Sequence, residues 1–110
     1  DYMLNKMIEV IEGLKVYPDN MLANLARTHG LIFSQRVLLS LMDKGLRRPQ
    51  AYDVVQRCAM KTWKDGTDFK DNLLADKEAN RYFTKKELDS IFDLDYYLRN
   101  IGKIFKRLGL

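Results

Sequence analysis

Apolar residues recur at spacings of three and four positions along almost the whole chain, and no segment alternates apolar and polar residues as a half-buried strand does. The pattern therefore predicts helices and no sheet. The first predicted helix covers about residues 1–15, and its apolar face is formed by Met3, Leu4, Met7, Ile8, Ile11 and Leu14. A second begins within "YPDN", because Pro18 suits the first helical position and Asp19 or Asn20 is available as a cap. Its apolar face comprises Met21, Leu22 and Leu25.

A third helix is predicted from about Ile32 to Lys44, between Gly30 and Gly45, which both suit the left-handed conformation that ends a helix. Its apolar residues point in too many directions for one face, so this helix is expected at the centre of the fold. They are Val37, Leu38, Leu39, Leu41 and Met42. A fourth helix covers "RRPQAYDVVQRCAMKTW". Its predicted buried side carries Ala51, Tyr52, Val55, Cys58, Ala59, Thr62 and Trp63.

The C-terminal part of the chain predicts two or three further helices. A short fifth helix is expected around Phe69, Leu73 and Leu74. "TKKE", from Thr84 to Glu87, is a capping box that opens a sixth. A last helix begins near Asp93, with an apolar face formed by Leu94, Leu98, Ile101, Phe105 and Leu108. The predicted fold class is therefore all-α, a compact bundle of six or seven helices.

Length, charge and cysteine content limit the number of domains, the partners and the cellular location that fit this sequence. A length of 110 residues suits one domain, and the net charge of +4 permits acidic partners without requiring them. The single cysteine, Cys58, excludes an intrachain disulfide and fits a reducing, cytoplasmic location. No apolar run reaches the roughly 20 residues of a membrane-spanning helix, and the start of the chain does not have the pattern of a signal peptide. A helical pattern already runs at Asp1, so we expect the chain to belong to something longer.

The stretch "THGLIFSQR", residues 28–36, is the first candidate for chemistry because it holds the only histidine, His29, close to Ser34 and Arg36. A nucleophilic triad needs a base within reach of the hydroxyl and a carboxylate that orients the base. This stretch contains no carboxylate, and a histidine also suits the negative end of a helix dipole. We therefore interpret the stretch as a joint between two helices. Ser34 or Thr28 is expected to bond a free helix-end amide, and Arg36 a carboxylate or a carbonyl.

The residues give little support to a metal site. One histidine and one cysteine far apart do not supply the three or four ligands of a zinc site. Asp89, Asp93 and Asp95 cluster, but the central glycine and closing glutamate of a calcium loop are missing. The simpler interpretation is that Asp93 caps the last helix and that Asp95 favours its positive end.

A DNA-binding helix-turn-helix around "DKGLRRPQAYDVV" is an alternative. The fourth helix presents Gln50, Gln56 and Arg57, but also Asp53, which would face phosphate. Basic residues also gather elsewhere, at Arg47, Arg48, Arg99, Lys103, Lys106 and Arg107. Because acidic residues are interspersed throughout, these charges are more typical of a solvated surface.

Several longer segments are more specific. They are "YPDNM", "GLIFSQRVLL", "AYDVVQ" followed by "AMK", and the closing "IFKRLGL". Their order and spacing resemble the C-terminal region of the adenylosuccinate lyase family in its bacterial form, over essentially the whole chain. The sequence departs from the family pattern at Arg47, where Ser or Thr is frequent, and at Cys58, where a small or polar residue is usual.

The resemblance implies a homotetrameric enzyme of the fumarase and aspartase superfamily. Such enzymes eliminate fumarate from adenylosuccinate, giving AMP, and from the succinyl-carboxamide ribotide of purine synthesis. A serine base and a histidine acid act without a metal or an organic cofactor, and three subunits contribute to each active site. That serine, that histidine and the phosphate-binding residues lie outside the matching segment. The resemblance therefore implies no catalytic residue in this chain, a purine nucleotide bound mainly by other domains, and neither nucleic acid nor membrane as a partner.

The resemblance also implies a division of the chain. Residues 1–15 correspond to the end of a central-bundle helix of the preceding domain, and residues 16–110 to the C-terminal helical domain. His29 does not match a catalytic histidine of the family, whereas Ser34 and Arg36 are candidates for supporting contacts near the active-site mouth. A free-standing helical interaction module of the same ancestry remains an alternative.

Overall fold

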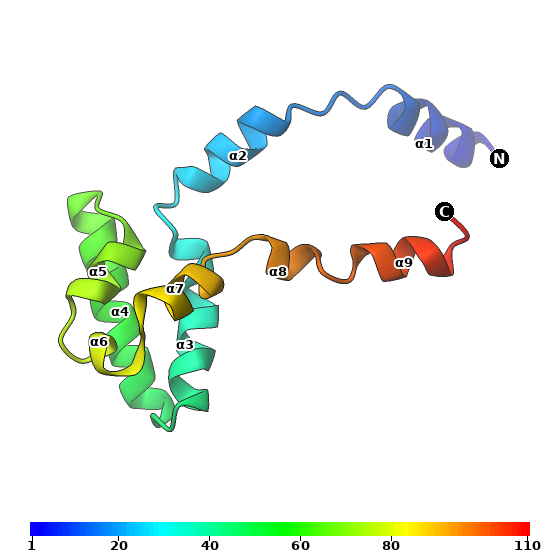
Figure 1. Cartoon of the computed structure of the whole chain (residues 1–110). Coiled ribbons are helices and arrows are strands. Elements are labelled where there is room, and N and C mark those ends of the chain that lie inside the picture. The colour runs from blue at the N-terminus through cyan, green and yellow to red at the C-terminus, as the bar shows by residue number, and fades with distance from the viewer.

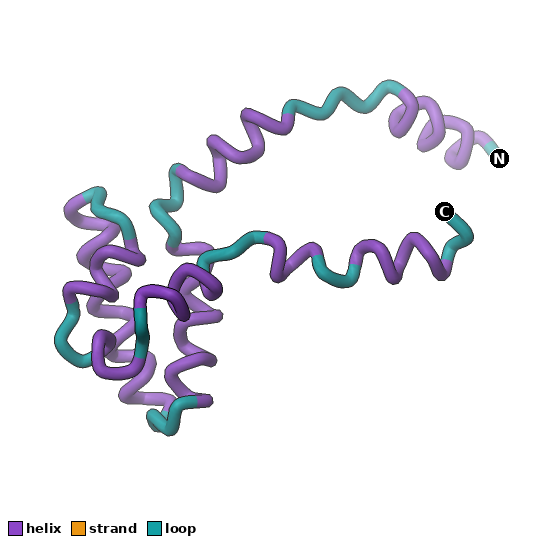
Figure 2. Tube along the Cα trace, viewed as in Figure 1, coloured by secondary structure: helices purple, strands orange, loops and turns teal.

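Nine α-helices and one short 3-10 helix account for the regular structure, and no strand is present, so the predicted all-α fold class is confirmed (Figure 2). The computed structural model describes residues 1–110. The elements are α1 (Tyr2–Glu12), α2 (Pro18–Ala26), the 3-10 helix η1 (Leu31–Phe33), α3 (Ser34–Asp43), α4 (Arg48–Asp65), α5 (Phe69–Ala75), α6 (Ala79–Tyr82), α7 (Lys85–Ile91), α8 (Asp95–Leu98) and α9 (Ile101–Arg107).

The core consists of η1 and α3 to α7, residues 31–92, with α3 packed against α4 and α5 packed against the other end of α4 (Figure 1). The side chains of Val37 and Leu41 on α3 are fully buried, which confirms the central position predicted for this helix. Leu39, by contrast, is half exposed. The largest fully buried side chains are Phe69, Leu41, Leu73, Leu88, Val37, Val54 and Thr62.

The buried face of α4 differs from the predicted one. Ala51, Val55, Cys58 and Thr62 are buried as expected, and the fully buried Val54 lies with them. Two aromatic side chains predicted on this face, Tyr52 and Trp63, are exposed instead. Helical spacing alone does not show which part of this apolar surface of α4 is buried, because residues three and four apart lie on neighbouring parts of one helix surface.

Helix ends follow local chemistry where the sequence signal is strong. The Thr84 hydroxyl accepts from the Glu87 amide at 3.3 Å, and the Glu87 carboxylate accepts from the Thr84 amide at 2.8 Å. This confirms the predicted capping box. Gly45, with a φ of +100°, follows the end of α3 as predicted. Gly30 has a φ of +82°, but it does not end α2, which ends at Ala26 with Arg27 as its C-cap; Gly30 is instead the N-cap of η1. The expected cap of α2 is wrong: neither Asp19 nor Asn20 caps it, and the N-cap position is Tyr17.

The predicted last helix is interrupted. It forms as α8 and α9, and residues 99–100 between them are not α-helical. The expected cap by Asp93 is wrong, because the N-cap position of α8 is Leu94 and no side chain caps it; the Asp93 carboxylate instead accepts from the Asp95 amide at 2.9 Å, one residue before that position. The four-residue α6, which the sequence did not predict, is a further reason why the helices outnumber the expected six or seven.

Two arms extend from the core. The N-terminal arm (residues 1–26, α1 and α2) and the C-terminal arm (residues 95–110, α8 and α9) run to the same side of the molecule (Figure 1). The Cα radius of gyration is 18.8 Å, and the principal extents are 58 × 32 × 24 Å. A chain of this length packed as one compact body has a radius of gyration of about 13 Å. The arms explain the difference, since no residue in either of them is buried.

Candidate functional site

The joint, residues 28–36, connects the N-terminal arm to the core and contains the chain's only histidine. His29 is the one non-glycine residue with positive φ, at 48°, and Gly30 follows at 82°. The two residues turn the chain between α2 and η1. The His29 carbonyl accepts a hydrogen bond of 2.9 Å from the Phe69 amide, and this bond ties the joint to the first residue of α5.

Gly30 has a second reason to be glycine besides its backbone conformation. A Cβ atom at this position would lie 2.8 Å from Cε1 of Phe92. The Phe92 ring also packs against Phe33, with ring centroids 5.0 Å apart, and against Phe69, at 5.9 Å. The joint is therefore held against the end of α7, close to the point where the C-terminal arm begins.

The fold brings a carboxylate to the histidine, although none is near it in sequence. The Nδ1 atom of His29 lies 3.7 Å from Oδ1 of Asp68, and both side chains are largely exposed. No nucleophile completes this pair, because no hydrogen bond joins His29 to Ser34 or to a threonine hydroxyl. The Thr28 hydroxyl donates to the Leu25 carbonyl at 2.7 Å, whereas the sequence predicted that it would bond an amide. Ser34 makes no side-chain cap of α3. The interpretation of a structural joint agrees with this geometry.

Arg36 connects α3 to the base of the C-terminal arm. Its guanidinium donates to the Ile91 carbonyl at 2.5 Å and to the Asp93 carbonyl at 3.2 Å. The same group lies over the Tyr96 ring, 3.7 Å from the centroid. The expected bond to a carboxylate or carbonyl is therefore made to two carbonyls more than 50 residues away in sequence. These contacts fix the direction in which the C-terminal arm leaves the core.

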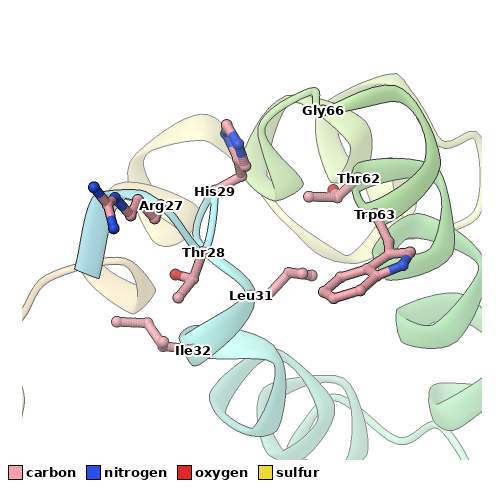
Figure 3. A pocket seen from close by; sticks show the side chains of 8 residues that line it. All are labelled: Arg27, Thr28, His29, Leu31, Ile32, Thr62, Trp63 and Gly66. Atoms are coloured by element: carbon pink, nitrogen blue, oxygen red, sulfur yellow. The ribbon is translucent and has the colours of Figure 1, made fainter. Parts of the chain in front are cut away.

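A cavity of about 580 Å³ opens beside the joint (Figure 3). Leu31 points toward the indole of Trp63 on α4, Thr62 lies next to Trp63, and His29 lies at the rim. The Trp63 side chain is 79% exposed. The Thr62 hydroxyl is engaged, since it donates to the Cys58 carbonyl and accepts from Asn72. The lining thus offers apolar surface and no free, buried reactive group.

The two arms enclose a larger apolar groove, with a cavity of about 810 Å³. Its walls come from both arms and the segment before α8, with Met21, Leu22 and Leu25 on one side and Leu94, Tyr97 and Leu98 on the other. Ile32 lines both this groove and the cavity beside the joint. Beyond the groove, the apolar stripe of α1 is 52–83% exposed at Met3, Leu4, Met7, Ile8 and Ile11. Apolar surface of this extent is typical of a protein interface.

Several charged side chains are occupied by partners within the chain. Arg57 bonds Asp76 at 2.9 Å and Glu78 at 3.2 Å, and its guanidinium holds the pKa of the Asp76 carboxyl below its usual range. Arg57 is one of the side chains that the helix-turn-helix alternative turns toward DNA. Its position between two carboxylates disfavours the helix-turn-helix alternative.

Two further candidates for chemistry are the single cysteine and a cluster of metal ligands. Burial raises the pKa of the Cys58 thiol to about 11, so this cysteine stays protonated near neutral pH. No group of three or more His, Cys, Asp or Glu side chains is arranged to hold a metal ion. None of the helices combines the length and apolar character needed to cross a membrane.

Comparisons with known proteins agree on one family. The family model "Adenylosuccinate lyase C-terminus" matches residues 30–108. Adenylosuccinate lyase of Streptococcus mutans is 44% identical over 110 residues, which are 100% of this chain and 26% of that protein. The Thermotoga maritima enzyme is 46% identical over 106 residues, 96% of this chain and 25% of that protein. The Bacillus subtilis enzyme is 43% identical over 110 residues, 100% of this chain and 26% of that protein. The chain spans about a quarter of the length of these relatives.

Proposed function

This chain belongs to the adenylosuccinate lyase C-terminus family, and from that premise we propose that it is the C-terminal helical domain of an adenylosuccinate lyase and acts in assembly. The parent enzyme would eliminate fumarate from adenylosuccinate, giving AMP, and from the succinyl-carboxamide ribotide of purine synthesis. It would work in the cytoplasm as a homotetramer without a metal or an organic cofactor. The purine nucleotide would be bound mainly by other domains.

One observation carries the assembly role: the arms hold many of the chain's large apolar side chains and bury none of them. Burying one such side chain stabilises a protein by roughly 1.5–3 kcal/mol, so an apolar surface of this size is expected to have a partner. We propose that residues 1–15 form the end of a helix in the central bundle of the tetramer. Residues 16–110 form the domain that packs against that bundle.

We propose that the joint has a structural role and not a catalytic one. His29 has a carboxylate beside it but no nucleophile, and both hydrogen bonds of the Arg36 guanidinium go to backbone carbonyls, those of Ile91 and Asp93. Arg36 would then support the active-site mouth by fixing where the C-terminal arm points, and Ser34 by its place in the joint as the first residue of α3. Catalysis needs a positioned acid and base, each worth about 10²–10⁴ in rate. We propose that other domains supply both.

A free-standing interaction module is the second candidate, because exposed apolar arms also suit a partner of another kind. A chimera separates the two functions. The C-terminal quarter of the Thermotoga maritima enzyme, 46% identical to this chain, is replaced by residues 1–110. We expect this chimera to sediment as a tetramer and to release fumarate from adenylosuccinate, and we expect the isolated chain to release none.

Two results would oppose the proposal. A chimera that folds but neither assembles nor releases fumarate would favour the free-standing module. Fumarate release by the isolated chain, shown free of contaminating enzyme by mass spectrometry, would mean that catalytic residues lie within these 110 residues.

A further inference from the structure

The cavity beside the joint, about 580 Å³, has the size and the lining of a small-molecule site. Such sites are typically about 300–1,000 Å³ and mostly apolar, with a few polar groups that orient the ligand. Apolar walls come here from Leu31, Ile32 and Trp63, and a cation comes from Arg27. Because the lining holds no free, buried reactive group, the cavity suits the binding of a ligand and not its chemical conversion.

Trp63 provides an unoccupied aromatic surface on one wall of this cavity. Its side chain is 79% exposed, although an indole has a large apolar area to bury. The aromatic pairs and cation–π pairs within the chain involve phenylalanine and tyrosine rings only. Every nucleobase has a flat π-face that stacks on an aromatic side chain. The open indole therefore favours a ligand with a flat heteroaromatic ring.

Arg27 adds a positive charge at another wall. Figure 3 shows it across the cavity from Trp63, with Thr28 and Leu31 between them. Its side chain is exposed and makes no ion pair within the chain. His29, at the rim, already has the Asp68 carboxylate 3.7 Å from its Nδ1 atom. Arg27 is thus the cation left for an anionic group, and the fork of a guanidinium matches a phosphate.

We propose that this cavity binds a nucleoside monophosphate, with the base stacked on Trp63 and the phosphate held by Arg27. A nucleoside monophosphate carries its base and its phosphate on opposite sides of a ribose, as the two walls require. The Thr28 hydroxyl donates to the Leu25 carbonyl, so its oxygen is left to accept from a ribose hydroxyl. The inference goes beyond the assembly role, because it gives the domain a ligand of its own.

Fluorescence of the 110-residue chain tests the site with AMP as the probe. Trp63 is the only tryptophan, so a change in its emission reports on this cavity alone. We expect AMP to quench it saturably, and isothermal titration calorimetry to give the same dissociation constant. Adenosine lacks the phosphate and ribose 5-phosphate lacks the base. Each should bind about tenfold or more weakly, because a charged hydrogen bond or a base stack is lost.

Substitutions of the two exposed side chains test each contact separately by calorimetry. Trp63→Ala should weaken AMP binding by about tenfold or more, whereas Trp63→Tyr keeps an aromatic ring and should weaken it less. Arg27→Gln should weaken AMP binding about tenfold and leave adenosine binding unchanged. Tyr52→Ala and Arg48→Gln are the matched controls. They remove an exposed ring and an exposed cation outside the cavity, and should bind AMP like the unmodified chain.

Three outcomes would overturn the site. The first is neither heat nor quenching with AMP up to about 1 mM, the upper end of typical KM values. The second is a Trp63→Ala variant, folded by circular dichroism, that binds AMP as tightly as the unmodified chain. The third is an Arg27→Gln variant that loses as much affinity for adenosine as for AMP. The assembly role is tested separately by the chimera.

Discussion

Replacing Gly30 by alanine is a direct test of how the joint is packed. The residue has a φ of +82°, and an alanine held in the left-handed region costs about 1–2 kcal/mol. Its Cβ would also lie 2.8 Å from the Phe92 ring. Moving a packed ring in a core costs typically 1–3 kcal/mol. Gly30→Ala should therefore lower the free energy of unfolding by about 2–5 kcal/mol, the sum of these two effects.

Gly66 provides the matched control for the backbone cost alone. Its φ is +68°, and no atom lies within 4 Å of a Cβ built there. Gly66→Ala should thus lose only the backbone part, about 1–2 kcal/mol. The difference between the two variants isolates the contact with Phe92.

Urea unfolding followed by far-ultraviolet circular dichroism measures both variants, because the chain is helical throughout the core. Equal losses in the two variants would refute the packing argument at Gly30, and so would a neutral Gly30→Ala. A further check is Phe92→Leu, which makes room for the new methyl group. The combination with Gly30→Ala should lose less than the sum of the two single changes.

The remaining predictions concern the core and one helix cap. Leu41→Ala should cost about 2–5 kcal/mol, and Leu38→Ala less because Leu38 is only partly buried; equal urea midpoints would contradict this. Thr84→Ala should cost about 1 kcal/mol, and an unmeasurable loss would mean that α7 frays. Lys44 and the Thr84 cap lower the pKa of Glu87 from 4.5 to about 2. Since the pKa of Glu87 is lower in the folded state than in the unfolded state, its carboxylate stabilises the fold above pH 4.5, and this stabilisation is lost as pH falls toward 2. As pH falls across that window, the urea midpoint of Glu87→Gln should fall less than that of the unmodified chain. An equal fall in both proteins would contradict the lowered pKa of Glu87.

Local signals in the sequence predicted the core elements well. The capping box at Thr84 and the helix end at Gly45 are formed by neighbouring residues, so their chemistry can be read directly from the chain. The central position of α3 followed from its apolar residues in several directions. The break between α8 and α9 was missed because the apolar spacing continues through residues 99–100.

Contacts between distant residues could not be predicted in the same way. Asp68 reaches His29 only because α5 returns to the joint, and Arg36 finds its two carbonyls more than 50 residues away. The exposed positions of Tyr52 and Trp63 have a related cause. Their apolar character marks surface that the core of this chain does not cover, and spacing does not distinguish such a surface from a core face.

The central claim is that this chain contributes assembly and no chemistry. It is tested most directly in the chimera by measuring fumarate release from each sedimenting species, with Met21→Lys and Leu98→Lys in the groove. Tyr52→Lys with Met60→Lys is the control, because these α4 side chains are similarly exposed. The account predicts less tetramer for the groove variant, unchanged turnover in the tetramer that remains, and full assembly for the control. A groove variant that assembles fully but turns over about 10²-fold more slowly, the effect of losing a catalytic group, would contradict it.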